Sequence, residues 1–235
     1  MDLEQIINVA KILFSGIGAS LQIFVLTIIF AIPLGIMVAV FRNSKCKLIS
    51  YLMKGYILLI RGTPIMLQII VVYFCPYYMF GISYDRFIAI IIAFVINYAA
   101  YFSEIFRSGI NSIPEGQKEA AHTLGLNRVQ TFFLIILPQV VKIILPSMSN
   151  EVISLLKTTS LAQIIGVTEM FALAQKQASY NFSIIPLVIA GGYYLILVFF
   201  VSILFNKVEK KLEYYSWFYS WFLGRREKSC FNPKK

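Results

Sequence analysis

The chain has 235 residues, of which 59% are hydrophobic and 14% are charged. A soluble domain carries about 25% charged residues, so this composition excludes a soluble enzyme and indicates an all-α integral membrane protein. About five spanning helices of about 20 residues each fit this length, so we expect one transmembrane domain over residues 1–235. The net charge of +10 needs no nucleic acid partner, because the basic residues follow apolar stretches, where the positive-inside rule explains them.

The first span is expected over residues 17–41, with residues 1–16 lying at the outer membrane interface. Arg42, Lys45 and Lys47 follow the span, and such a basic cluster indicates the cytoplasmic side. The N-terminus is therefore predicted to lie outside.

The second span lies between residues 49 and 80 and is interrupted by the segment Arg61-Gly62-Thr63-Pro64. Proline is favoured as the first residue of a helix. The span therefore starts either near Pro64, with the preceding piece along the inner surface, or further upstream. The sequence leaves both boundaries open.

The third span is predicted between two arginines, from Arg86 to Arg107. Its 21 steps correspond to about 32 Å, close to the bilayer core of about 30 Å. The polar stretch over residues 108–137 is expected to form a cytoplasmic loop that carries a helix.

The fourth span is expected over residues 138–160, followed by an outer segment, 161–180, that contains a short apolar-periodic helix. The fifth span follows over residues 181–206. The tail, residues 207–235, begins with three lysines and is rich in aromatic residues, which predicts a cytoplasmic C-terminus and an interfacial anchor.

The loop contains a motif with a defined spacing. Glu119, Ala120 and Ala121 are followed by Gly125 and then by Leu137-Pro138. A polar helix between two spans indicates a docking site for a soluble partner; the alternative is an ordinary loop that contains this tripeptide. The spacing resembles the docking loop of permease subunits in bacterial ATP-binding-cassette importers.

Further segments resemble the polar amino acid branch of these importers, the histidine/glutamine/arginine permease family with the type I fold. They cover roughly residues 60–165. Ser108 stands where the family pattern has glycine. The matching segments are Arg61–Pro64 with Gln68, Tyr101 with Glu104 and Arg107–Ile110, Gly116-Gln117, and Asn150 with Lys157–Leu161.

The resemblance implies an importer in the bacterial cytoplasmic (inner) membrane. Its partners would be a second permease subunit, most simply identical, an ATPase subunit dimer that holds ATP and Mg²⁺, and an extracytoplasmic substrate-binding protein. The chain itself contains no GxxxxGK[ST] segment, so we expect no cofactor and no catalysis in it. The expected ATPase-coupling residues are Glu119, Ala120, Ala121 and Gly125. The single histidine and the three cysteines lack metal-ligand spacing, so no metal site is expected.

Polar residues form two stripes at membrane depth, where such groups are costly and usually functional. Helical spacing places Asn97, Tyr101 and Glu104 on one face and Ser147, Glu151, Ser154 and Thr158 on another. Facing stripes would line a cavity. The candidate substrate-binding residues are Gln68, Asn97, Tyr98, Tyr101, Glu151, Ser154 and Thr158.

Glu151 has no basic residue three or four positions away. Either another helix supplies a cation, or the substrate does, and the second case predicts a basic amino acid such as arginine, lysine or histidine. For Asn97, Ser147 and Ser154 the alternative role is an interhelical hydrogen bond. For Glu104 it is pairing with Arg107 or Arg61.

Two other functions are considered. An ion-gradient-driven secondary amino acid transporter would have discontinuous helices and often an internal repeat, and no repeat is visible. An intramembrane Ser-Lys hydrolase would use Ser154 or Ser160 with Lys157.

Overall fold

The computed structural model describes residues 2–230, and side chains over residues 2–212. Within these residues, all regular secondary structure is helical. Four helices are long and apolar enough to span a membrane, and a bent helix pair supplies up to a fifth span. The expected all-α membrane protein with about five spans is confirmed. The predicted aromatic anchor in the tail lies outside the residues with described side chains.

Helix α1 (Leu3–Arg42) is one continuous helix that contains both residues 3–16 and the expected first span, and where the span begins within it stays a prediction. Its 40 residues correspond to about 60 Å, twice the thickness of the bilayer core. Gly16 lets α1 approach another segment closely, because an added Cβ would lie 2.7 Å from the Met170 Cα. Further along, α1 packs mainly on α4.

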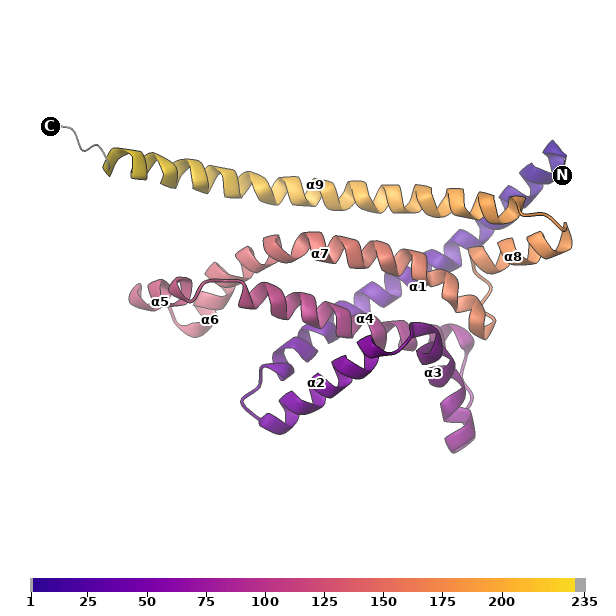
Figure 1. The fold of residues 1–235 in the computed structure, drawn as a ribbon, viewed down its shortest axis with the longest axis horizontal. Coiled ribbons are helices and arrows are strands. Elements are labelled where there is room, and N and C mark those ends of the chain that lie inside the picture. Colours follow the sequence, from indigo (N-terminus) through magenta and orange to yellow (C-terminus); the bar gives the residue numbers. More distant parts are fainter. Residues whose placement is uncertain (1, 231–235) are drawn as a thin grey trace.

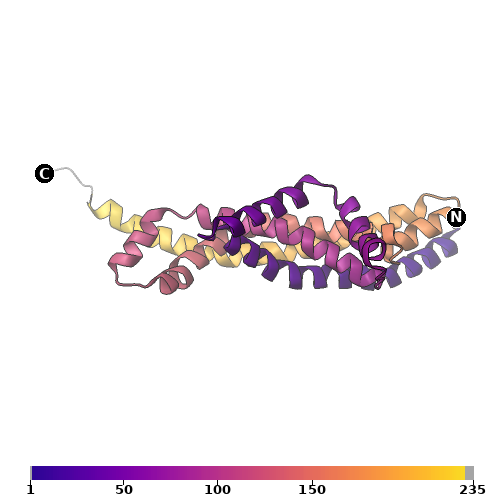
Figure 2. The same cartoon turned by 90° about the horizontal axis from the view of Figure 1, so that it is seen from below.

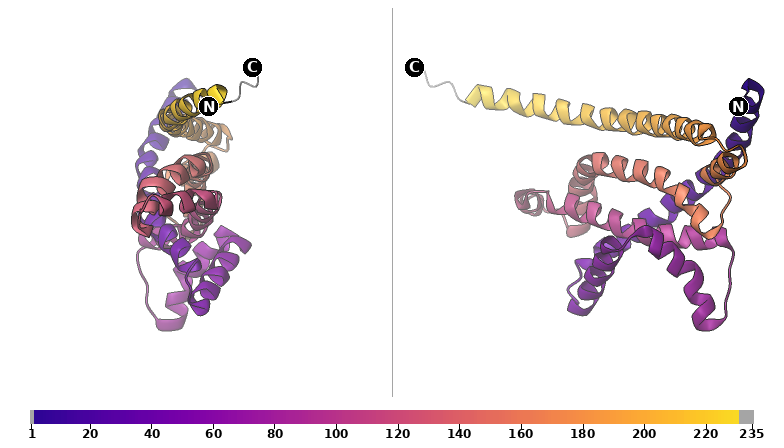
Figure 3. Two further views of the ribbon diagram at one scale, coloured as in Figure 1. Left: turned by 90° about the vertical axis from the view of Figure 1, so that its left-hand side faces the viewer. Right: turned by 45° about the vertical axis from the view of Figure 1, so that its right-hand side comes forward.

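Helices α2 (Lys47–Gly62) and α3 (Ile65–Phe80) are separated by the extended residues Thr63 and Pro64 and bent by 111°. The two helices diverge like the sides of a V (Figure 3). Proline has no backbone N–H to donate, and the new helix begins directly after Pro64. Ile57 and Ile60 of α2 are buried in a cluster with residues of α1 and α4.

Helix α4 (Arg86–Asn111) is the central helix and contacts α1, α2, α3 and α7. It begins at Asp85, whose side chain accepts hydrogen bonds from the backbone N–H groups of Phe87 and Ile88. It ends four residues beyond the predicted Arg107. Its buried face contains alanines and aromatic residues, which together permit close packing on several sides.

The predicted loop over residues 108–137 is largely helical. Only residues 112–114 and 124–127 are outside helices. The helices are α5 (Glu115–Thr123), α6 (Arg128–Gln130), the π-helix η1 (Thr131–Ile136) and the start of α7 (Leu137–Thr158). The expected helix between the third and fourth spans is therefore present as α5.

The outer segment contains the 3₁₀-helix η2 (Thr159–Ile165) and α8 (Met170–Tyr180), which confirms the short helix expected there. The last helix, α9 (Ile185–Cys230), runs along the edge of the molecule beside α7 and α8 (Figures 1 and 2). In the most apolar part of this helix, within residues 185–212, only 6% of the residues are buried. Such an exposed apolar surface suits contact with lipid.

The two ends of the molecule differ in what they contain. The N-terminus and α8 lie at one end, and α5, α6 and the C-terminal part of α9 lie at the other (Figure 1). This arrangement agrees with an outer N-terminus and a cytoplasmic α5, and the orientation in the membrane stays a prediction.

Candidate functional site

The side-chain amide of Gln68 forms hydrogen bonds across the break between α2 and α3. Gln68 Nε2 donates to the carbonyl oxygens of Ile60 (2.8 Å) and Thr63 (3.1 Å), while its Oε1 accepts from Asn97 Nδ2 (2.8 Å). Thr63 Oγ1 donates to the Leu59 carbonyl at 2.8 Å. Carbonyls at a helix end lack helical donors, and leaving them unpaired in a membrane costs several kcal/mol. These side chains therefore allow the span to break.

Replacing Gln68 by alanine is expected to lower the free energy of unfolding by about 1–3 kcal/mol, because buried polar groups lose their partners. Ser202→Ala is the control, since its hydroxyl donates to Val198 O within an unbroken helix. That change should cost about 0.5 kcal/mol or less. Thermal denaturation of the detergent-purified protein measures both. Equal losses would show that Gln68 does not hold the break.

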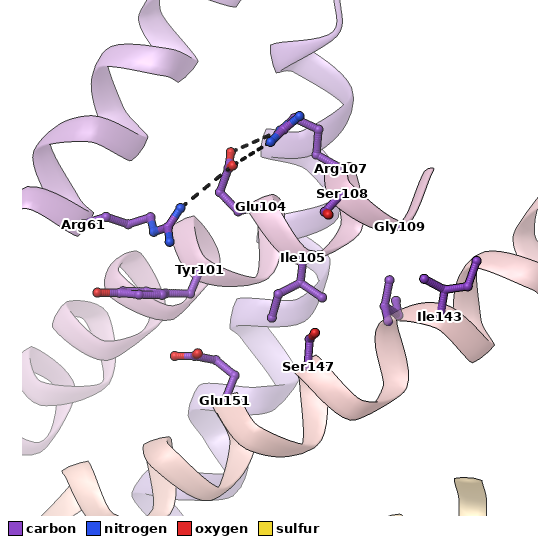
Figure 4. Close-up of a pocket in the computed structure, with 11 residues that line it drawn as sticks. Arg61, Tyr101, Glu104, Ile105, Arg107, Ser108, Gly109, Ile143, Ser147 and Glu151 are labelled. Atoms are coloured by element: carbon purple, nitrogen blue, oxygen red, sulfur yellow. Dashed lines mark hydrogen bonds and ion pairs between the residues drawn. The ribbon is translucent and has the colours of Figure 1, made fainter. Parts of the chain in front are cut away.

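A cavity of about 400 Å³ lies where α2, α4 and α7 meet (Figure 4). Arg61 of α2 and Glu151 of α7 approach it from different sides, with Tyr101 of α4 between them. Ser147 and Arg107 also line it. Part of each predicted polar stripe therefore lines one cavity: Tyr101 and Glu104 from one stripe, and Ser147 and Glu151 from the other.

Glu104 lies at the centre of an ion cluster in the wall of this cavity. Its carboxylate pairs with Arg107 (3.0 Å), with Arg61 (3.9 Å) and with Arg42. The expected pairing with Arg107 or Arg61 is confirmed for both. Arg42, which the sequence places only in the basic cluster after the first span, is a further partner of Glu104.

The Glu151 carboxylate has no ion-pair or hydrogen-bond partner among residues 2–212. Arg61 comes from another helix to the same cavity but pairs with Glu104 instead. The structure therefore leaves the Glu151 charge available inside the cavity.

Of the other candidates, Asn97 and Tyr98 are buried, and Gln68, Ser154 and Thr158 are partly buried. Tyr98 is 3% exposed, and its hydroxyl lies near the hydroxyls of Ser154 and Thr158. Asn97 is 4% exposed and, like Gln68, is engaged at the helix break. The structure thus divides the seven candidates into three groups, and their role in substrate binding stays a prediction. The groups are Tyr101 with Glu151, Gln68 with Asn97, and Tyr98 with Ser154 and Thr158.

Helix α5 ends in a glycine turn. Gly125 has φ +78°, its N–H donates to His122 O (2.9 Å), and Leu126 N–H donates to Ala121 O (3.1 Å). This pair of bonds is a Schellman motif, which requires a left-handed residue. Glu119 and Ala120 are exposed while Ala121 is buried. The left-handed conformation of this turn therefore favours glycine at position 125.

A groove of about 560 Å³ lies beside α5. Its lining combines Lys118, His122 and Arg128 with apolar residues that include Leu126 and Phe132. Exposed apolar residues continue around it, with Leu124 77% and Val129 65% exposed. Such a surface at a polar end of the molecule is typical of a protein contact.

Glu169 is a buried residue that the sequence analysis missed. It is 0% exposed and caps α8 by accepting from the N–H groups of Phe171 (2.8 Å) and Ala172 (2.7 Å). Ser20 of α1 and Tyr194 of α9 donate to the same carboxylate, each at 3.2 Å. The available signal was its isolation, because it is the only acidic residue between Glu151 and Glu209.

The chain is similar in sequence to permease proteins of several transport systems. The L-cystine transport system permease protein TcyB of Bacillus subtilis is 36% identical over 206 residues, covering 87% of this chain and 88% of the relative. The arginine transport system permease protein ArtQ of the same organism is 35% identical, covering 91% and 98%. The octopine transport system permease protein OccM of Rhizobium radiobacter is 35% identical, covering 84% of each chain.

The crystal structure of an amino acid ABC transporter with histidines contains a chain that is 29% identical, with a TM-score of 0.82 over 90% of this chain and 99% of that one. The MetNI methionine ABC transporter, 13% identical with a TM-score of 0.67, shares the fold. Residues 31–214 match the model of one family. The chain therefore belongs to the family of binding-protein-dependent transport system inner membrane components.

Proposed function

We propose that the chain lines the translocation path for a basic amino acid in an ATP-driven importer of the bacterial inner membrane. The observation that carries the proposal is Glu151, a carboxylate in the cavity wall with no ion-pair or hydrogen-bond partner within residues 2–212. In a poorly hydrated cavity an unpaired charge is costly, and a cationic substrate would compensate for it. Relatives named for cystine, arginine and octopine transport support an amino acid or a derivative as the substrate.

The relatives do not distinguish a basic from a neutral substrate, because the cystine and arginine permeases have similar sequence identity to this chain, 36% and 35%. The basic side chain is proposed from Glu151 alone. In the competing case Glu151 would pair with the α-ammonium group that every amino acid carries.

Replacing Glu151 by glutamine separates the two cases. For a basic substrate, we expect the affinity of the purified permease–ATPase complex for arginine or lysine to fall about 10- to 100-fold, because a charge-assisted contact is lost. The affinity for glutamine should change much less. Substrate-stimulated ATPase activity without the binding protein provides the measurement, and Glu4→Gln, an exposed carboxylate near the N-terminus, is the control.

Equal losses for arginine and glutamine would assign Glu151 to the α-ammonium group. No loss for either would make Glu151 a structural residue, and the basic assignment would fall.

The partners belong to the same proposal. The chain is a transport component, and its sequence has no phosphate-binding loop, so we assign ATP and Mg²⁺ to a separate ATPase dimer. Exposed Leu124 and Val129 beside Glu119, Ala120 and Gly125 support docking of that subunit on α5. A second, identical permease subunit and an extracytoplasmic binding protein complete the assembly. The mass of the purified complex tests this stoichiometry.

The alternatives have less support. Membership in a binding-protein-dependent family disfavours a transporter driven only by an ion gradient. For the hydrolase, Ser160 Oγ donates to the backbone carbonyl of Lys157. No hydrogen bond joins the Lys157 ammonium to a serine hydroxyl within residues 2–212.

Labelling of single cysteines in intact cells should report the orientation. We expect cysteines introduced at Asp85 and Lys176 to react with an impermeant thiol reagent, because an outer N-terminus places both the turn before α4 and helix α8 outside. Cys230 should not react until the cells are opened. Reaction at Cys230 in intact cells would reverse the orientation and remove α5 from the cytoplasm.

A further inference from the structure

We infer that Arg61 binds the α-carboxylate of the transported amino acid. Together with Glu151, it would be the second charged residue of the cavity that contacts the substrate. This inference rests on the proposed function, because it assumes that an amino acid enters the cavity. Glu151 accounts only for the cationic end of the substrate, and Arg61 would bind the anionic α-carboxylate.

The Arg61 guanidinium is positioned without being fully neutralised. Its Cζ lies 5.2 Å from the centroid of the Tyr101 ring, which supports it by a cation–π contact. Its Nη1 lies 3.9 Å from Glu104 Oε2, the longest of the measured pairs in that cluster. The side chain is 46% exposed. Stacking covers a face of the guanidinium and leaves N–H donors at its edge for a second anion.

The charges around Glu104 also favour an anion. Arg42, Arg61 and Arg107 share this one carboxylate, so the cluster contains three cations and one anion (3 − 1 = +2). Arg42 does not line the cavity, whose charged lining residues within 2–212 are Arg61, Arg107, Glu104 and Glu151. Arg107 is held to Glu104 by two hydrogen bonds, at 3.0 and 3.4 Å. Arg61 is therefore the cation most available to a ligand.

The placement of the two available charges suits a basic amino acid. Arg61 and Glu151 lie on different sides of Tyr101 (Figure 4). The α-carboxylate and the cationic end of such a substrate are separated by its side chain, which agrees with an anion site and a cation site on different sides of one cavity. A guanidinium binds a carboxylate through two parallel hydrogen bonds, which adds orientation to attraction.

Binding of arginine and of arginine methyl ester to the purified permease–ATPase complex tests the inference. The ester lacks the anionic carboxylate and keeps the rest of the molecule. In the wild-type complex we expect arginine to bind about 10- to 100-fold more tightly than its ester. In Arg61→Gln this ratio should fall close to one, through weaker binding of arginine and not of the ester. Arg42→Gln, which removes a different partner of Glu104, should keep the ratio.

A wild-type ratio in Arg61→Gln would overturn the inference while leaving the role of Glu151 intact. If arginine binds no better than glutamine, the basic assignment fails instead, and glutamine with its methyl ester then tests Arg61 in the same way. If Arg61→Gln does not assemble, Arg61→Lys keeps the charge and removes the paired donors. An intermediate ratio supports the inference, and an unchanged ratio contradicts it.

Discussion

Replacing Gly125 by leucine is expected to uncouple ATP hydrolysis from transport while leaving the protein inserted in the membrane. In reconstituted complexes, uptake per ATP hydrolysed should fall about 5- to 30-fold. This range corresponds to the cost of about 1–2 kcal/mol for placing a Cβ in the left-handed region. Parallel measurement of uptake and of phosphate release gives the ratio.

The effect should act through the turn and not through steric overlap. Within residues 2–212, no atom outside the local chain would lie within 4 Å of a Cβ added at Gly125, whereas its φ is +78°. A leucine would therefore open the two hydrogen bonds of the turn and shift the exposed Leu124 relative to α5. The helix itself and the membrane spans keep their contacts.

Gly125→Asn is the matched control, because asparagine tolerates positive φ far better than leucine. It should keep most of the coupling. Wild-type coupling in Gly125→Leu would count against docking at this turn. Equal loss in the leucine and asparagine variants would mean that any side chain at this surface blocks the partner, whatever the backbone conformation.

Replacing Glu169 by alanine should cause the largest loss of stability, about 2–4 kcal/mol in the free energy of unfolding. The change leaves two backbone N–H groups and the hydroxyls of Ser20 and Tyr194 without their shared acceptor in a site that is 0% exposed. Helix α8 should then lose its attachment to α1 and α9. Thermal unfolding in detergent, with proteolysis near α8, measures the effect.

Asp85 provides the control, since it caps α4 through the same two kinds of N–H group but is exposed. Asp85→Ala should cost only about 1 kcal/mol, the usual value for an N-cap. If the two variants lose the same amount, Glu169 acts only as a cap, and its contacts with Ser20 and Tyr194 contribute nothing measurable.

Local features of this protein follow from the sequence because their causes lie within a few residues. Apolar stretches of sufficient length predicted the spans, since unpaired backbone groups in lipid force helix formation. The helix α5 and its Gly125 turn are closed by bonds that span at most five residues. The pairing of Glu104 with Arg107 is likewise a contact between neighbouring helical turns.

Tertiary structure decided what partners the polar residues have. Gln68 and Asn97 were expected to face substrate, and they meet each other across 29 positions at the helix break. Arg42 reaches Glu104 from another helix, and Ser20 reaches Glu169 across 149 positions. A polar residue in a membrane must find a partner, but its own sequence neighbourhood does not say which one. Packing of α1, α4 and α7 makes that choice, and it leaves Glu151 and part of Arg61 available in the cavity.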